Sequence, residues 1–148
     1  MRSLKLWVIG MAVIIGMLLP DLTNAANYHD QDFINAIVGE AGNQGYQGML
    51  AVACALRNRM RVPYYRDNVL SGVYGANAKH LSKESRETFR LAEKAWIDSK
   101  MNNIVGSAYI WGTDSDIRKF RTQDWFNNMV PVVKIGDHTF FKGDHNAN

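Results

Sequence analysis

Apolar positions recur at helical spacing in three segments of the first hundred residues. The first segment runs from Asp30 to Glu40, where Asp30 is the expected N-cap and Gly42 the expected stop. The second runs from about Tyr46 to Met60 and should be the central core helix, because its apolar residues repeat at every turn. The third is expected from Ser82 to about Ser99. The first part of the chain is therefore predicted to be helical.

The pattern changes towards the C-terminus. Residues Ser107 to Trp111 indicate a short strand. Val130 to Ile135 and His138 to Lys142 indicate a hairpin closed by Gly136-Asp137, where a leading glycine suits a type II′ turn. Helices followed by strands predict an α+β domain.

The N-terminal residues have the features of a secretory signal. Arg2 and Lys5 precede an uncharged apolar run from Leu6 to Leu19, which is shorter than the roughly 20 residues that a membrane-spanning helix needs. Small side chains at residues 23–25 suit a signal peptidase. We therefore predict a signal peptide over residues 1–25 and an exported protein, in the periplasm or cell wall, with no stable membrane insertion after cleavage. An uncleaved anchor is the alternative.

The remaining segment, residues 26–148, is long enough for one domain with its own core. Its 15 basic and 13 acidic residues leave a net charge of about +2, without the basic stripe that nucleic-acid binding requires. Arg57, Arg59 and Arg61 alternate with other residues at a helix end, so we expect a solvated face. Cys54 is the only cysteine, which excludes an intrachain disulfide, and it is expected to be buried.

Glu40 is the candidate for chemistry. It follows Ile37 by three residues and Phe33 by seven, so a helix that reaches it places its carboxyl on the apolar side. A carboxyl shielded from water favours its protonated form and can donate a proton to a substrate oxygen. The competing interpretation is an exposed residue at a fraying helix end. Spacing alone leaves both open.

Several stretches resemble the SleB-type cell wall hydrolases, the spore cortex-lytic enzyme family. They are Gly39-Glu40-Ala41 with the ungapped run from Gly45 to Ala53, then Asn58-Arg59, Ser107-Ala108-Tyr109, Trp125 and the hairpin from Lys134 to Lys142. The resemblance covers most of residues 33–142. It is weakest at Gly42-Asn43, where the family commonly has Arg-Gly, and at Gly45, where it commonly has Pro.

The resemblance implies a lysozyme-like, transglycosylase-like fold: a helical core with a small antiparallel sheet towards the C-terminus. It also implies that the protein binds and cleaves peptidoglycan glycan strands without a cofactor or metal, with Glu40 as general acid and base. In lytic transglycosylation, the 6-hydroxyl of muramic acid attacks the anomeric carbon. Ordinary glycosidases use two carboxylates. The possible second ones, each expected to be a surface charge, are Glu84, Glu87, Glu93, Asp114 and Asp116.

Aromatic side chains are candidates for sugar binding, because their flat apolar faces suit pyranose rings. The candidates are Tyr46, Tyr109, Trp111 and Trp125. Tyr109 and Trp111 come first, since they lie on the strand that resembles the family's cleft strand. Packing between sheet and helices is the alternative for each, and Trp96 is expected in the core.

Three other functions stay open. A zinc peptidase or N-acetylmuramoyl-L-alanine amidase would take ligands from His29, His80, His138 and His145, whose spacing matches no compact zinc signature. A non-catalytic module of the same fold would bind peptidoglycan without cleaving it. A purely structural periplasmic protein is disfavoured only by the resemblance.

Overall fold

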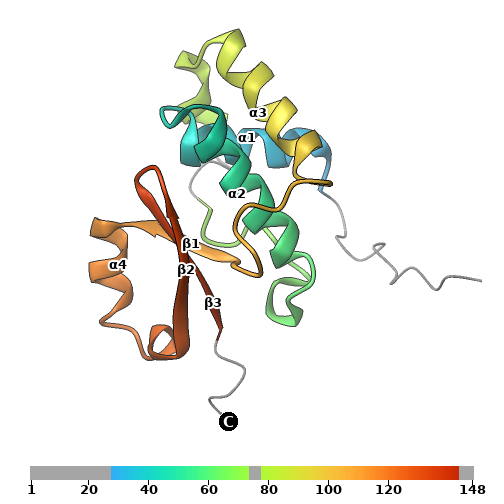
Figure 1. Cartoon of the computed structure of the whole chain (residues 1–148). Coiled ribbons are helices and arrows are strands. Elements are labelled where there is room, and N and C mark those ends of the chain that lie inside the picture. The colour runs from blue at the N-terminus through green and yellow to red at the C-terminus, as the bar shows by residue number, and fades with distance from the viewer. Residues whose placement is uncertain (1–27, 74–77, 144–148) are drawn as a thin grey trace, which may run out of the picture.

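The domain consists of a helical half and a sheet half. The computed structural model describes residues 28–73 and 78–143, so the predicted signal segment at residues 1–25 lies outside the described residues. Figure 1 shows helices α1, α2 and α3 gathered on one side and the sheet with helix α4 on the other. The helices are α1 (Asp30–Ala41), α2 (Gly45–Arg59), α3 (Arg86–Asp98) and α4 (Asp114–Phe120), with 3-10 helices at Pro63–Tyr65, Ala78–Lys83 and Asp124–Asn128. The strands are β1 (Ile110–Thr113), β2 (Met129–Ile135) and β3 (His138–Gly143). The α+β prediction is confirmed.

Helix α2 is the centre of the hydrophobic core, as its apolar pattern predicted. Every residue from Gly48 to Leu56 is buried, and the helix packs against both α1 and α3. Cys54 is 1% exposed and Trp96 of α3 is 3% exposed, so both were correctly predicted as buried. The Trp96 ring stacks on Phe33 of α1 with centroids 4.4 Å apart. Among residues 28–73 and 78–143, no helix has the length and apolarity needed to cross a membrane.

The antiparallel sheet has the strand order β1-β3-β2. The predicted hairpin is confirmed, and Gly136 at its turn has φ +58°, a positive φ such as the first central position of a type II′ turn requires. Trp111 lies opposite Phe140 on the face that joins the helical core, whereas Ile110 and Phe141 belong to a second cluster. Strand β1 thus connects the two halves.

Two predicted boundaries were wrong. Helix α3 begins at Arg86 and not at Ser82, because the Ser85 hydroxyl accepts the N–H of Thr88 at 3.1 Å and caps the helix there. The residue before α1 is His29, so Asp30 is its first residue and not its cap. These errors arise because several Ser and Asp residues can cap a helix, and tertiary contacts select one of them.

The strand expected from Ser107 to Trp111 is displaced along the chain. Strand β1 begins at Ile110 and continues to Thr113, because pairing with β3 decides its limits. Helix α4 was not predicted. The sequence does mark the start of this helix with a capping box, in which the side chains of Thr113 and Asp116 accept hydrogen bonds from each other's backbone N–H groups.

Candidate active site

The structure brings Glu40 into contact with Trp111, 71 residues further along the chain. Glu40 lies in the last turn of α1 and is half-buried. The indole Nε1 of Trp111, on β1, donates a hydrogen bond to Glu40 Oε2 at 3.0 Å. Trp111 itself is only 6% exposed, so its ring is fixed by the packing around it. A carboxyl at a helix end is thereby held in one orientation at the junction of helix and sheet.

The C-terminal end of α2 positions the chain that leads into β1. The side-chain nitrogen of Asn58 donates to the carbonyl oxygens of Gly106 and Ala108 at 2.8 and 2.7 Å. Arg59 Nε donates to the carbonyl oxygen of Tyr109 at 2.8 Å. Since these carbonyls directly precede β1, the Asn58-Arg59 pair determines where Trp111 enters the site.

Arg59 is a buried cation beside Glu40. It is 6% exposed, and its guanidinium lies over two aromatic rings, 4.4 Å from the centroid of Trp111 and 4.5 Å from that of Tyr65. Burial lowers the pKa of Arg59, and the nearby Tyr65 and Glu40 oppose that shift. Two further carbonyl oxygens, of Val69 and Ser71, accept hydrogen bonds from Nη1. The buried charge of Arg59 is thus stabilised by three backbone carbonyl groups and by the faces of the Trp111 and Tyr65 rings.

The expected solvated arginine face was therefore wrong for two of its three members. Arg59 is buried, and Arg57 is half-buried with its guanidinium 3.7 Å from the centroid of the Trp96 ring. Only Arg61 is exposed. The sequence pattern could not reveal this, because the segments that cover the end of α2 lie far away in the chain.

His138 is a second buried ionisable group near Glu40. It is 4% exposed, and burial lowers its pKa, while Glu40 and Asp116 oppose the shift through their charges. Its Nδ1 lies 3.1 Å from Gln44 Nε2, and Gln44 Oε1 accepts the N–H of Asp137 at 3.0 Å. The bond from Asp137 identifies which end of the Gln44 amide is the oxygen, so Gln44 Nε2 is the donor and His138 Nδ1 the acceptor. Neutral His138 therefore carries its hydrogen on Nε2. From the sequence, His138 was considered only as a zinc ligand of an alternative function.

The loop between α1 and α2 contains a residue in the left-handed conformation. Gly45 has φ +65°, which proline cannot adopt. The proline that the resemblance leads one to expect at this position would therefore not fit the turn observed here. This turn allows Gln44 to reach the β2–β3 hairpin, which ties the loop beside Glu40 to the sheet.

The four aromatic candidates occupy three different places. Trp111 lies beside Glu40, whereas Tyr109 and Trp125 line a separate pocket of about 450 Å³. Tyr46 lies between α2 and α3, where its hydroxyl donates to Asp98 and this hydrogen bond raises the pKa of Tyr46. Of the four, Trp111 is thus the candidate that the structure places at the acid.

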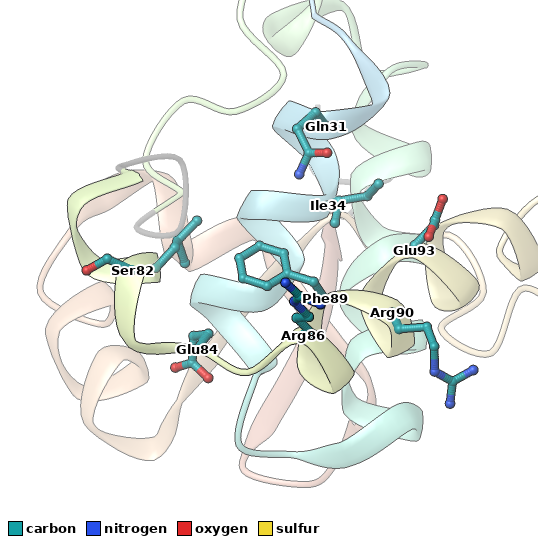
Figure 2. Close-up of a pocket in the computed structure, with 9 residues that line it drawn as sticks. Gln31, Ile34, Ser82, Glu84, Arg86, Phe89, Arg90 and Glu93 are labelled. Atoms are coloured by element: carbon teal, nitrogen blue, oxygen red, sulfur yellow. The ribbon is translucent and has the colours of Figure 1, made fainter.

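Three of the possible second carboxylates lie on the α3 side of the domain. Glu84 and Glu93 border a hollow of about 610 Å³ between α1 and α3. Figure 2 shows the Phe89 ring between Ile34 and the segment that carries Glu84, with Glu93 pointing outward. Glu87 is exposed and forms an ion pair with Arg90 at 2.6 Å, which lowers the pKa of Glu87. All three are surface charges, as expected.

The two aspartates of the same set have structural partners. Asp114 is exposed and lies 3.2 Å from Lys134 Nζ. Asp116 is half-buried and accepts hydrogen bonds from the hydroxyl and N–H of Thr113, which lower the pKa of Asp116. The charge of Asp116 also acts on His138, where it opposes the lowering of the histidine pKa by burial.

The histidines do not gather in the described part of the chain. His29 is exposed and His138 is buried, while the side chains of His80 and His145 lie outside that part. Within residues 28–73 and 78–143, no three His, Cys, Asp or Glu side chains form a group that could hold a metal ion.

Comparisons with known proteins agree with this architecture. The sequence profile of the cell wall hydrolase family matches residues 43–141. A spore cortex-lytic enzyme of Halalkalibacterium halodurans is 27% identical over 124 residues, which cover 78% of this chain and 36% of that protein. The chain thus spans about a third of the length of this curated relative.

Two solved structures share the fold. The catalytic domain of the germination-specific lytic transglycosylase SleB of Bacillus anthracis has a TM-score of 0.57 and 27% identity, covering 79% of this chain and 98% of that one. The catalytic domain of Bacillus cereus SleB has a TM-score of 0.57 at 24% identity, covering 79% and 94%. The predicted lysozyme-like fold is confirmed, and with two thirds of its length matched by the profile, the chain belongs to the cell wall hydrolase family.

Proposed function

We propose that this protein cleaves peptidoglycan glycan strands as a lytic transglycosylase, with Glu40 as its single acid and base. The observation that carries the proposal is the half-buried Glu40 carboxyl held at 3.0 Å by the Trp111 indole. The similarity to the catalytic domain of a lytic transglycosylase supports the reaction type. The family profile begins at Asn43, so the choice of Glu40 rests on this geometry and on its resemblance to the family's glutamate.

The hydrogen bond to Trp111 suggests where Glu40 carries its proton. An indole N–H can only donate, so Oε2 must accept. In the protonated acid the hydrogen is then favoured on Oε1. From there it is transferred to the glycosidic oxygen as the bond between that oxygen and the anomeric carbon breaks.

The second half of the reaction uses the same carboxyl as a base. The 6-hydroxyl of the muramic acid attacks the anomeric carbon, and its proton passes to the Glu40 carboxylate. A 1,6-anhydro ring forms, and Glu40 regains the proton that it donated, so no second carboxylate, metal or cofactor is required. The buried cation of Arg59 nearby stabilises the carboxylate between the two steps.

The aromatic candidates have different roles in this proposal. Trp111 orients Glu40, while Tyr109 and Trp125 contact sugar in the pocket that they share. Tyr46 instead stabilises the packing of α2 on α3, because its hydroxyl is bonded to Asp98. The enzyme acts in the periplasm or cell wall after removal of residues 1–25, and the mass of the exported protein tests that cleavage.

Digestion of purified sacculi tests the reaction. The protein from residue 26 onward should release muropeptides with 1,6-anhydro ends, which differ by the mass of one water from reducing ends. Glu40→Gln should release none and still sediment with sacculi. Reducing ends alone would replace transglycosylation with hydrolysis. Release of free peptides that stops on chelation would favour the amidase, and binding without release by the unaltered protein would favour the non-catalytic module.

A further inference from the structure

An aromatic pocket with a volume of about 450 Å³ lies next to strand β1. Four of its nine lining residues are aromatic: Tyr64, Tyr65, Tyr109 and Trp125. Tyr64 is 85% exposed and Trp125 is 46% exposed, whereas Tyr65 and Tyr109 are half-buried. Large aromatic side chains left in solvent around a hollow of ligand size are typical of a binding site.

The aromatic pocket is connected to Glu40 through Arg59. The guanidinium of Arg59 lies 4.5 Å from the Tyr65 centroid and 4.4 Å from the Trp111 centroid, so the two ring centres are at most about 9 Å apart. Trp111 in turn donates to Glu40. The aromatic pocket and Glu40 therefore lie within the length of a few sugar units of each other.

The lining of the aromatic pocket indicates which sugar it accepts. None of its nine lining side chains is charged. In a glycan strand, N-acetylmuramic acid carries a peptide with ionised groups, whereas N-acetylglucosamine is uncharged. Ionised groups next to an uncharged, largely apolar wall would lose hydration without gaining a partner. The pocket therefore suits an uncharged pyranose, with ring faces for stacking and tyrosine hydroxyls for hydrogen bonds.

The hollow between α1 and α3 provides a contrast within the same molecule. It is larger, at about 610 Å³, but its lining includes Arg86, Arg90, Glu84 and Glu93, and Figure 2 shows charged side chains around it. The aromatic ring in that lining, Phe89, has charged side chains around it. Of these two hollows, only the aromatic pocket combines ring faces with a neutral wall.

We propose that the aromatic pocket is a glycan subsite for an N-acetylglucosamine residue away from the cleaved bond, an inference that rests on the proposed function. Tyr64 and Trp125 are the stacking residues, because their rings are the most exposed. Tyr65 and Tyr109 form the fixed wall behind the sugar. Arg59 holds the Tyr65 ring by its cation–π contact and the Tyr109 backbone by a hydrogen bond.

Binding of chitotetraose, an uncharged oligomer of N-acetylglucosamine, to the Glu40→Gln protein tests the subsite without requiring cleavage. Calorimetry measures the affinity, and the NMR signal of the Trp125 indole N–H reports contact at the pocket. Tyr64→Ala and Trp125→Ala should each weaken binding about tenfold, while Tyr64→Phe, which keeps the ring, should retain most of it. Met101→Ala is the matched control, since Met101 is 88% exposed and does not line the pocket.

Unchanged affinity in both alanine variants, or an unshifted Trp125 signal in the presence of bound chitotetraose, would overturn the subsite. So would absence of chitotetraose binding, or a larger Trp125 shift with muramyl dipeptide than with chitotetraose. These outcomes are independent of catalysis. If the unaltered protein fails to cleave sacculi although chitotetraose binds in the pocket, the proposed function is wrong and the sugar site stands. If cleavage occurs but the pocket variants bind normally, only the subsite is wrong.

Discussion

Helix α1 has a carboxyl group bonded to a tryptophan indole near each of its ends. At the N-terminal end, Asp30 Oδ1 accepts from Trp96 Nε1 at 2.8 Å, and at the C-terminal end, Glu40 Oε2 accepts from Trp111 Nε1 at 3.0 Å. The two contacts have the same chemistry and nearly the same length. Their surroundings are different, and the difference shows why only one of them is suited to proton transfer.

The solvent and the helix dipole distinguish the two carboxyls. Asp30 is exposed in the first turn, where the positive end of the dipole stabilises a negative charge. Glu40 is half-buried in the last turn, at the negative end. Asp30 is thus placed to remain a carboxylate that supports the helix. Glu40 is placed where its charge depends on nearby groups and on the substrate, as a group that alternately donates and accepts a proton requires.

An arginine of α2 lies over each indole, again with different burial. Arg57, over Trp96, is half-buried and donates to the Ser99 hydroxyl and the Trp96 carbonyl. Arg59, over Trp111, is buried and donates hydrogen bonds to three backbone carbonyl oxygens. The C-terminal end of α1 therefore lies near a buried arginine and the buried His138, whereas the arginine at the N-terminal end is only half-buried. Paired substitutions at the two ends can break or sharpen this comparison.

The largest difference is expected between Glu40→Gln and Asp30→Asn. Both changes keep an oxygen that can accept the indole hydrogen bond, so neither should disturb the fold strongly. Loss of the acid and base should lower the rate of glycan cleavage about a thousandfold, equal to about 4 kcal/mol of transition-state stabilisation. Asp30→Asn should leave the rate within about twofold of the parent. Rates of muropeptide release measure both, and equal losses would remove the functional distinction between the two ends.

The arginine pair should differ in stability. Arg59→Leu leaves three carbonyl oxygens without their donor in a buried place, so the free energy of unfolding should fall by about 3 kcal/mol. Arg57→Leu should cost about 1 kcal/mol, because its surroundings are more accessible to water. Urea denaturation measures both values, with exposed Arg61→Leu as the reference for a change of about 0.5 kcal/mol or less. A cost for Arg59→Leu as small as that reference would contradict its structural role.

The tryptophan pair should separate stability from activity. Trp111→Phe and Trp96→Phe each remove one indole donor and should each lower the free energy of unfolding by about 1 kcal/mol. Only Trp111→Phe should slow glycan cleavage, by about tenfold, since it removes a hydrogen bond that orients the Glu40 carboxyl. The change should appear in kcat more than in KM. If both variants lose activity equally, the effect comes from general destabilisation and not from the orientation of Glu40.

The smallest expected effect concerns the pH dependence of stability. Burial lowers the pKa of His138, so the unfolded chain takes up a proton at this histidine more readily than the folded domain does. Its contribution to stability is complete above the ordinary histidine pKa of about 6.5 and is lost as the pH falls towards the lower folded value. The free energy of unfolding, measured by urea denaturation, should therefore fall less between pH 7 and pH 5 in His138→Gln than in the parent protein. Substitution of exposed His29, near the other end of α1, is the control. If the free energy of unfolding of His138→Gln depended on pH as strongly as that of the parent, the lowered pKa of His138 would be contradicted.

The success of the sequence-based prediction varied with the range of the interaction. Helices α1 and α2 and the hairpin were predicted because each is encoded by local periodicity or by a turn residue, such as Gly136. Strand β1 was displaced by two or three residues, since its limits depend on pairing with β3. Helix α4 was missed although Thr113 and Asp116 mark its start, because its short apolar pattern gave no periodic signal.

The site was predicted only in part. Glu40 was selected from its place on an apolar helix face together with the resemblance to the family, and Trp111 because its strand resembles the family's cleft strand. The sequence contains no indication that the two side chains touch. Arg59 was expected on a solvated face and His138 was considered only as a zinc ligand, because neither residue type is expected to be buried. Arg59 is covered by residues 10 to 50 positions away in the chain, from Val69 to Tyr109, and His138 contacts Gln44, 94 positions away.

The sequence alone was sufficient to determine the helical core and the hairpin, and it placed Glu40 in line with the apolar side of α1 without deciding whether its carboxyl is shielded. These features depend on which side chains avoid water at a spacing of 3.6 or 2 residues, and that is a local property of the chain. The tertiary structure alone decided which of two indole-bonded carboxyls lies in a half-buried, polar junction and which remains in solvent. That outcome depends on dielectric surroundings and charge neighbours, which exist only after α1, α2 and the sheet have packed together.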